Sequence, residues 1–323
     1  MITFPRFVDP RSRNYTTYHN QLEQYGLSFQ RQITQALCSE FPGQEVDASY
    51  SISTTGSDGR LEKGPQSKIE LVIFGYKEKQ KDPETALAKV RGWLGDSLFP
   101  EIEFKNVGRL FLSGYMGDIN RPYPTRVLDS RFLYGNYRQN HAALMQIATE
   151  LNLDAGRTII DKFKDYLRRA KKITREGKGR FKGREVTHFD LNDGVAFYDN
   201  ESVGIARSSF KQGPLRLVQF GLTSEIMRKI RNKDFDLDLL DHMPQNTVDR
   251  ILFFETEGKA KLPHQKIESL VDNYMFFLWQ YHLAQENWRI DRKKETGFDK
   301  IEVKERLKDL TSLVESGILS CVS

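Results

Sequence analysis

The sequence lacks the features that mark several classes of protein. Only two of its 323 residues are cysteines, Cys38 and Cys321, which is too few for a disulfide framework. No stretch reaches the ~18 uncharged apolar residues that a membrane span needs, and the N-terminus lacks the basic-then-apolar layout of a secretory signal. Internal repeats and low-complexity segments are absent as well. These absences exclude a disulfide scaffold and a repeat array, and they predict a reduced, cytoplasmic protein with no membrane partner.

Charge of one sign is also scarce. The chain has 49 lysines and arginines against 44 aspartates and glutamates, which leaves a formal net charge of only +5. This small excess is compatible with a phosphate-bearing ligand but does not require one. Apolar residues make up 38% of the chain and aromatic residues 11%, which predicts a packed core and excludes collagen-like and disordered classes. The length allows two domains.

The first part of the chain predicts a helix followed by a small sheet. Apolar residues recur every three or four positions over residues 14–41, from Tyr18 to Leu37, which is typical of one face of a helix. The pair Asp82-Pro83 is a typical start of a second helix. Enrichment in β-branched and aromatic residues predicts strands at 46–54, 68–76, 101–107 and 109–115. This order of elements favours a small mixed sheet with flanking helices.

From about residue 126 the pattern becomes mainly helical. Helices are predicted at 137–151, 155–174, 214–231, 247–257, 265–290 and 301–316. Short strands are predicted at 186–198 and 203–207, and the basic run at 168–184 is interpreted as a solvated helix end and a loop. The predicted fold class is α+β. Its parts are an N-terminal helix (1–45), an α/β core (46–125) and a mainly helical domain (126–323) with a short β insertion near 186–207.

The turn between the first two strands carries residues suited to phosphate chemistry. A bend at Gly56-Ser57 lets backbone N–H groups approach an anion closely. Arg60 and Lys63 would add positive charge toward the phosphates. Glu70 lies on the following strand, which is rigid enough to present a carboxylate to Mg²⁺. The pattern therefore predicts a site for a nucleoside triphosphate with a divalent metal ion.

This arrangement resembles the DNA polymerase β-type nucleotidyltransferase superfamily. The family pattern is Gly-Ser, a spacer and a carboxylate–X–carboxylate strand, and here ten residues separate Ser57 from Lys68-Ile69-Glu70. The segment Gly59-Arg60-Leu61-Glu62 is similar to one branch, the GlnD-like uridylyltransferases of the bacterial PII nitrogen-signalling protein and their relatives. Two later segments match that branch in the family's order: Leu128-Asp129-Ser130-Arg131-Phe132-Leu133-Tyr134-Gly135-Asn136 and Phe210-Lys211-Gln212-Gly213-Pro214-Leu215-Arg216.

The resemblance implies a nucleotidyltransferase that moves a nucleoside monophosphate from an NTP to a hydroxyl of a protein, an RNA or a small molecule. It implies Mg²⁺ or Mn²⁺ as the cofactor, with Glu70 as the metal ligand. A third carboxylate would activate the attacking hydroxyl. Glu101 and Glu103, which share one strand face, are both candidates, and Glu103 is carried over. Contacts to the nucleotide would come from Gly56, Ser57, Arg60, Lys63, Lys211 and Arg216.

Lys68 departs from the family pattern, because it occupies the position of the first metal carboxylate. Two unit charges ~4 Å apart interact by about 4 kcal/mol at an effective dielectric constant of ~20, so a lysine there weakens metal binding. The alternative interpretation is a catalytically degenerate protein of this fold, in which Lys68 contacts phosphates directly and the protein acts as a nucleotide-binding or partner-binding regulatory module. A third hypothesis, RNA binding by the basic run, ranks last because only Phe181 offers a stacking aromatic ring there.

Each of these patterns also has an ordinary structural interpretation. Gly-Ser-Asp-Gly is a common turn, and Glu70 is also explained as a solvated strand residue. Asp129 and Arg131 would form an ion pair at a helix start, and residues 211–216 a capped helix end. The apolar stretch at 274–279 is predicted to be buried helix core.

Overall fold

The computed structural model divides the chain into two compact units. The first consists of Met1–Pro5, Asn20–Ala155 and Lys233–Asn246, and the second of Arg6–His19, Gly156–Asn232 and Thr247–Ser323. The structure describes residues 15–40, 50–64, 67, 69–74, 104–110, 127–150, 160–161, 163–168, 170–171, 178–181, 184–187, 211–231, 240, 242–256, 263–290 and 300–318.

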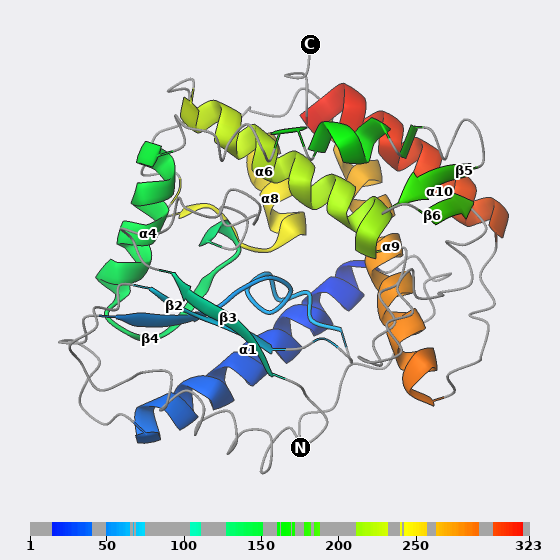
Figure 1. Ribbon diagram of the computed structural model, residues 1–323. Helices are drawn as coiled ribbons and strands as arrows, with labels where there is room; N and C mark the ends of the chain where they lie inside the picture. Colours follow the sequence, from blue (N-terminus) through cyan, green and yellow to red (C-terminus); the bar gives the residue numbers. More distant parts are fainter. Residues whose placement is uncertain are drawn as a thin grey trace. The chain divides into compact units, whose positions relative to one another are not determined.

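The first unit is built around a four-stranded mixed sheet with the strand order β3-β2-β1-β4 (Figure 1). The strands are β1 (Ser51–Thr54), β2 (Ile69–Phe74), β3 (Phe104–Leu110) and β4 (Arg131–Gly135). The central β1 pairs antiparallel with both β2 and β4, while β3 pairs parallel with β2. The α+β class with a small mixed sheet, predicted from the sequence, is therefore confirmed.

Two helices of this unit pack on the sheet, α1 (Tyr15–Glu40) and α4 (Tyr137–Glu150). Neighbouring residues of a strand point to opposite faces of a sheet. On β1, Ser53 Oγ donates to Asn140 Oδ1 of α4 at 2.9 Å, whereas Thr54 Oγ1 accepts from Gln30 Nε2 of α1 at 3.1 Å. The two helices therefore cover opposite faces of the central strand (Figure 1). Both helices lie within one residue of their predicted bounds.

The core of the first unit lies between α1 and the sheet. The side chains predicted to line one face of α1 are buried as far as they fall in this unit: Leu22, Tyr25, Phe29, Ile33 and Leu37. They pack over the sheet face that carries Thr54, where Ile52 on β1 and Leu71, opposite Thr54 on β2, are buried as well. Burial of side chains this large supplies most of the driving force for packing the helix on the sheet.

The second unit is a helical assembly centred on one long helix. Its helices are α6 (Arg216–Arg231), α8 (Thr247–Thr256), α9 (His264–Ile290) and α10 (Lys300–Leu313), with π-helical turns at Lys211–Leu215 and Val314–Ile318. α9 packs against both α8 and α10. Residues 274–279 of α9 are all buried, as predicted. Within the described part of the chain, no helix combines the length and apolar character that crossing a membrane requires.

The prediction of two separate strands around residue 108 was wrong. β3 runs without a break from Phe104 to Leu110. Its pairing with β2 advances from Leu71 opposite Asn106 to Ile73 opposite Arg109, so β3 contains one residue more than β2 over this stretch. An extra residue on one strand is a β-bulge, which glycine often marks. Gly108, which separates the two predicted strands, therefore lies at an irregularity within one strand.

The interpretation of the basic run as a helix end and a loop was also incomplete. The described residues at 160–161, 163–168 and 170–171 are helical, but two strands follow, β5 (Lys178–Phe181) and β6 (Arg184–Thr187). They pair antiparallel, with Phe181 opposite Arg184. Only Lys182-Gly183 separates this pair in the sequence, and two-residue connections with glycine are typical of tight hairpins.

Several predictions fall partly or wholly outside the described residues. These are the helix beginning at Asp82, most of the strand at 186–198, the strand at 203–207, and the residues Lys68, Glu101 and Glu103. The predicted domain boundary near residue 126 lies inside the first unit, because β4 and α4 complete the packing of its sheet.

Candidate functional site

The candidate site begins where the chain leaves β1 and bends at Gly56. Thr55 N–H donates to Glu70 O at 3.0 Å, so the pairing of β1 with β2 continues to the edge of the bend. Gly56 adopts φ +66°, a left-handed conformation that favours glycine. A Cβ on Gly56 would lie 3.1 Å from Glu70 Oε2, and the Glu70 side chain is half-buried. The bend and the carboxylate that the sequence assigned to one site are therefore neighbours.

The segment after the bend forms a compact turn. Arg60 N–H donates to Gly56 O at 3.0 Å, and Glu62 N–H donates to Ser57 O at 2.8 Å. These hydrogen bonds use donors from the second half of the turn, so they leave the Ser57 N–H at its start unused, as at the first turn of a helix. Gly56 and Ser57 are half-buried, whereas the rest of the turn through Glu62 is buried. The start of the turn is therefore its accessible part.

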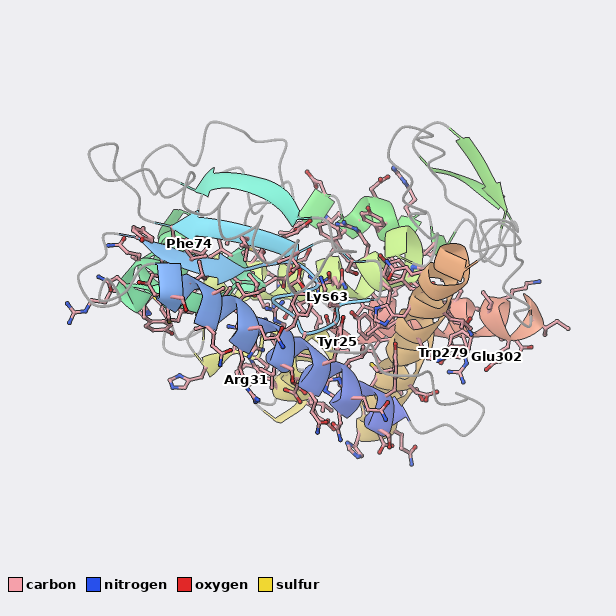
Figure 2. The ribbon with its side chains drawn as sticks, turned by 90° about the horizontal axis from the view of Figure 1, so that it is seen from below. Tyr25, Arg31, Lys63, Phe74, Trp279 and Glu302 are labelled. Atoms are coloured by element: carbon pink, nitrogen blue, oxygen red, sulfur yellow. The ribbon has the colours of Figure 1, made fainter. Side chains whose placement is uncertain are left out.

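Lys63, predicted to face phosphates, is instead a buried cation of the unit's interior (Figure 2). The residue is 1% exposed. Its Nζ lies 3.1 Å from Asp58 Oδ1 and donates to Ser67 O at 2.7 Å. The same ammonium lies 4.9 Å from the centroid of the Phe29 ring of α1, a cation–π distance. This geometry does not favour the predicted contact between Lys63 and a phosphate.

Arg60 has a similar environment. Its Nε lies 2.9 Å from Glu62 Oε2, and its Nη1 lies 2.5 Å from Asp129 Oδ2. All three side chains are at least nine-tenths buried. A planar guanidinium can bond two carboxylates at once, and here it bridges a neighbour in the turn and a residue two positions before β4. Arg60 therefore serves the structure of the turn, and a direct phosphate contact stays a prediction.

Asp58 lies at the centre of the turn, where its two carboxylate oxygens bond different groups. Oδ1 faces Lys63, and Oδ2 accepts from Glu70 N–H at 3.2 Å. Burial raises the pKa of the Asp58 carboxyl above its ordinary value, and the Lys63 ammonium opposes that shift. Burial, reinforced by the Asp58 charge, raises the pKa of Tyr25 on α1 to about 12. Asp58 therefore links the turn to β2 through groups inside the protein.

Helix α1 supports the turn through residues that sequence reasoning missed. Gln30 is a polar residue of this helix, yet it is buried, and its Nε2 donates to Asp58 O at 2.9 Å. Gly26 allows close approach, because a Cβ there would lie 2.8 Å from Leu61 Cδ2. Two features of the sequence could have indicated this packing. One is a glutamine next to Phe29 of the apolar stripe, and the other is a glycine in the middle of a long helix.

Asp129 and Arg131 also contact the turn. The structural interpretation of the sequence was an ion pair between them at a helix start. In the structure Asp129 bonds Arg60, and Arg131 Nε donates to Gly59 O at 3.3 Å. A Cβ on Gly59 would lie only 1.7 Å from Asp129 O, so the two backbones touch directly. The family-like segment at 128–136 is thus next to the family-like turn.

Comparison with known proteins adds no assignment. No protein-family model matches the chain, and no curated protein matches it.

The remaining sequence-predicted residues are not all in this unit. Lys211 begins the π-helical turn that precedes α6, and Arg216 is the first residue of α6, so both belong to the second unit. The Arg216 guanidinium lies 5.5 Å from the centroid of the Phe220 ring. Lys68, Glu101 and Glu103 lie outside the described residues.

Two described carboxylates lie at the turn and differ in how well they suit Mg²⁺. Glu70 is half-buried beside the accessible bend, whereas Asp58 is buried and bonded to Lys63. Within the described part of the chain, no three His, Cys, Asp or Glu side chains gather as a metal site. Mg²⁺ commonly binds one or two carboxylates together with substrate phosphates and water. The residues therefore fit a Mg²⁺ ion that arrives with a nucleotide and takes one protein ligand, Glu70.

Proposed function

We propose that the protein is a nucleotidyltransferase that binds an NTP at the Gly56-Ser57 bend and transfers its nucleoside monophosphate to an acceptor hydroxyl. The acceptor would belong to a protein, an RNA or a small molecule. The order and spacing of the three motifs, which resemble the GlnD-like branch, support this reaction class. The geometry of the bend supports its location in the first unit.

The proposal rests on one observation, the contact between the bend and the acid. The left-handed Gly56 lies against the Glu70 carboxylate, with its would-be Cβ 3.1 Å from Oε2. A carboxylate repels phosphate, so an acid beside an anion-binding bend is useful when a cation lies between them. A nucleotide triphosphate that carries Mg²⁺ supplies both the anion and the cation.

In this proposal each residue has a limited task. The N–H of Ser57, which the bonds of the turn leave unused, donates to a phosphate oxygen. Glu70 holds the Mg²⁺ ion, which when bound neutralises charge on the triphosphate. Arg60 and Lys63 act indirectly, since their ion pairs with Asp129 and Asp58 keep the turn in shape. The missing Cβ at Gly56 leaves room for the phosphate beside the acid.

The direct test is transfer of label from an α-labelled NTP in the presence of Mg²⁺ or Mn²⁺. Glu70→Gln keeps the size of the side chain and removes its charge, so we expect transfer to fall by about a hundredfold. Glu305→Gln, at an exposed position of α10, is the matched control and should transfer normally. Host extract supplies the acceptor, and a panel of four NTPs identifies the base. Unchanged labelling by Glu70→Gln would remove the mechanism.

Replacing Gly56 by alanine tests the bend itself. A Cβ in the left-handed conformation costs about 1–2 kcal/mol, and here it would also press on the Glu70 carboxylate. We expect about a tenfold loss of NTP affinity, measured by calorimetry, with a modest loss of stability in urea. Gly56→Asn is the matched variant, because asparagine tolerates this conformation better; it should lose affinity with less loss of stability. Full affinity in both variants would place the nucleotide elsewhere.

A regulatory protein that binds nucleotide without transferring it is the second candidate. Two observations favour it. Asp58, the buried acid at the centre of the turn, is neutralised by Lys63, and the sequence has Lys68 where the family has a metal carboxylate. This candidate predicts metal-independent NTP binding and no label transfer. Lys68→Asp would then make binding depend on Mg²⁺. If the wild type and this variant both bind no nucleotide in calorimetry, both candidates fail.

A further inference from the structure

We propose that Asp129 is a positioning residue that acts through Arg60 to hold the Gly56-Ser57 bend in its binding conformation. Its carboxylate bonds the Arg60 side chain in the second half of the turn. It anchors the far side of the turn to the start of β4, so its removal should loosen the bend while leaving the sheet intact. This role in ligand binding rests on the proposed function, but the effect on the conformation of the turn does not.

The ion pair between Arg60 and Asp129 anchors the turn. Arg60 Nη1 and Asp129 Oδ2 are 2.5 Å apart, and both residues are more than nine-tenths buried. Such charge-assisted bonds are about twice as strong as neutral ones, and a buried pair is shielded from competing water. Ser130, the next residue, is fixed separately, because its Oγ donates to Val127 O at 2.7 Å. The carboxylate therefore projects from a stable segment.

Arg60 also connects this ion pair to the bend. Arg60 carries the guanidinium that Asp129 holds, and its own backbone N–H donates to Gly56 O at 3.0 Å. The side chain and the backbone of one residue thus join Asp129 to the left-handed glycine. A shift of Arg60 would be transmitted to Gly56 through a single hydrogen bond.

The backbones of the turn and of residue 129 also lie close together. Gly59 lies so near to Asp129 that a Cβ would be 1.7 Å from its carbonyl oxygen, and Arg131 Nε donates to Gly59 O. The turn is thereby held by residues 129–131 at two successive positions, Gly59 and Arg60. The bond of Arg60 to Glu62 lies within the turn and does not anchor it to β4.

The experiment compares amide hydrogen exchange and NTP affinity in Asp129→Asn. We expect the amides of Arg60 and Glu62 to exchange about tenfold faster or more, while amides of β2 exchange as in the wild type. Affinity for Mg·ATP or the preferred NTP should fall about tenfold, with a smaller loss of transfer rate at saturating nucleotide. Ser130→Ala is the matched control, because it removes a neighbouring buried hydrogen bond without touching Arg60; the turn should keep its protection.

A second variant keeps the test decisive if Asp129→Asn does not fold. Arg60→Lys keeps a positive charge facing Asp129 but lacks the planar fork that places separate donors on Glu62 and Asp129, so exchange in the turn should rise less than in Asp129→Asn. Unchanged exchange of the turn amides in both variants, or an equal increase throughout β2, would overturn the positioning role. A wild-type protein that binds no nucleotide would instead remove the proposed function, and the exchange result would still decide how the turn is held.

Discussion

Replacing Lys63 by methionine is expected to destabilise the sheet-bearing unit by about 3–5 kcal/mol, the usual cost of leaving one member of a buried ion pair without its partner. Lys63 is 1% exposed and Asp58 4%. The substitution removes the cation 3.1 Å from Asp58 Oδ1 and the donor to Ser67 O, while keeping most of the apolar length of the side chain. Urea unfolding followed by a probe in the first unit measures the loss.

The same variant should also change how stability depends on pH. Burial already holds the pKa of Asp58 above its ordinary value, and loss of the Lys63 charge removes an effect that lowers it. A carboxyl whose pKa is higher in the folded state binds its proton more tightly there, so folding is favoured by acid. Between the folded and unfolded pKa values of Asp58, the deficit of Lys63→Met relative to wild type should therefore shrink as the pH falls.

Two controls make this result specific. Lys304→Met changes an exposed lysine of α10 and should alter stability by less than about 0.5 kcal/mol. Adding Asp58→Asn to Lys63→Met removes the unpaired charge, so the double variant should lose less than the sum of the two single variants. A loss below about 1 kcal/mol for Lys63→Met, or strict additivity, would mean that the pair does not hold the turn together.

The elements of the fold were predictable because helices and strands show their periodicity locally. Helix α1 and helix α9 each ended within one residue of the predicted bounds, since long apolar stripes are unambiguous. The strand β3 was split in two because a glycine at a bulge has the same local signature as a glycine in a turn. Pairing with a neighbouring strand decides between them, and that information is not local.

The candidate site was predictable only in part, because some of its contacts join residues that are far apart in the sequence. The bend and the acid could be placed together because they flank one turn between paired strands. The carboxylate partner of Arg60 could not be predicted, since Asp129 lies 69 residues further along the chain. A basic residue in a glycine-rich turn has the same appearance whether it faces a ligand or a buried carboxylate. Charge and spacing predicted the anion-binding bend, but not which cations were already neutralised.

This difference changes the interpretation of the site. A turn whose cations both face phosphate would attract any polyanion, whereas here Arg60 and Lys63 are neutralised by carboxylates of the same unit. Binding at the proposed site would then depend on backbone N–H groups and on a cation brought beside Glu70. The proposed site should therefore discriminate strongly between Mg·NTP and free NTP, which separates it from a general basic surface.

Replacing Gly59 by alanine is expected to destabilise the first unit by about 3 kcal/mol or more, the upper end of what overpacking costs. The new Cβ would lie 1.7 Å from the carbonyl oxygen and 2.9 Å from the carbonyl carbon of Asp129, and 3.1 Å from Thr55 Cα. All three atoms belong to backbone, so no side-chain rotation relieves the clash. The turn must separate from residue 129, which breaks the Arg60–Asp129 contact as well. Thermal unfolding and exchange of the turn amides measure both effects.

Gly26→Ala is the matched comparison for this prediction, since its Cβ would also be too close to the turn. There the nearest atom is Leu61 Cδ2 at 2.8 Å, the end of a flexible side chain. Alanine also favours the helix by about 1 kcal/mol over glycine, so the two effects should largely cancel and leave stability within about 1 kcal/mol of wild type. If Gly59→Ala is as mild as Gly26→Ala, the turn does not touch residue 129, and the positioning role of Asp129 is lost with that contact.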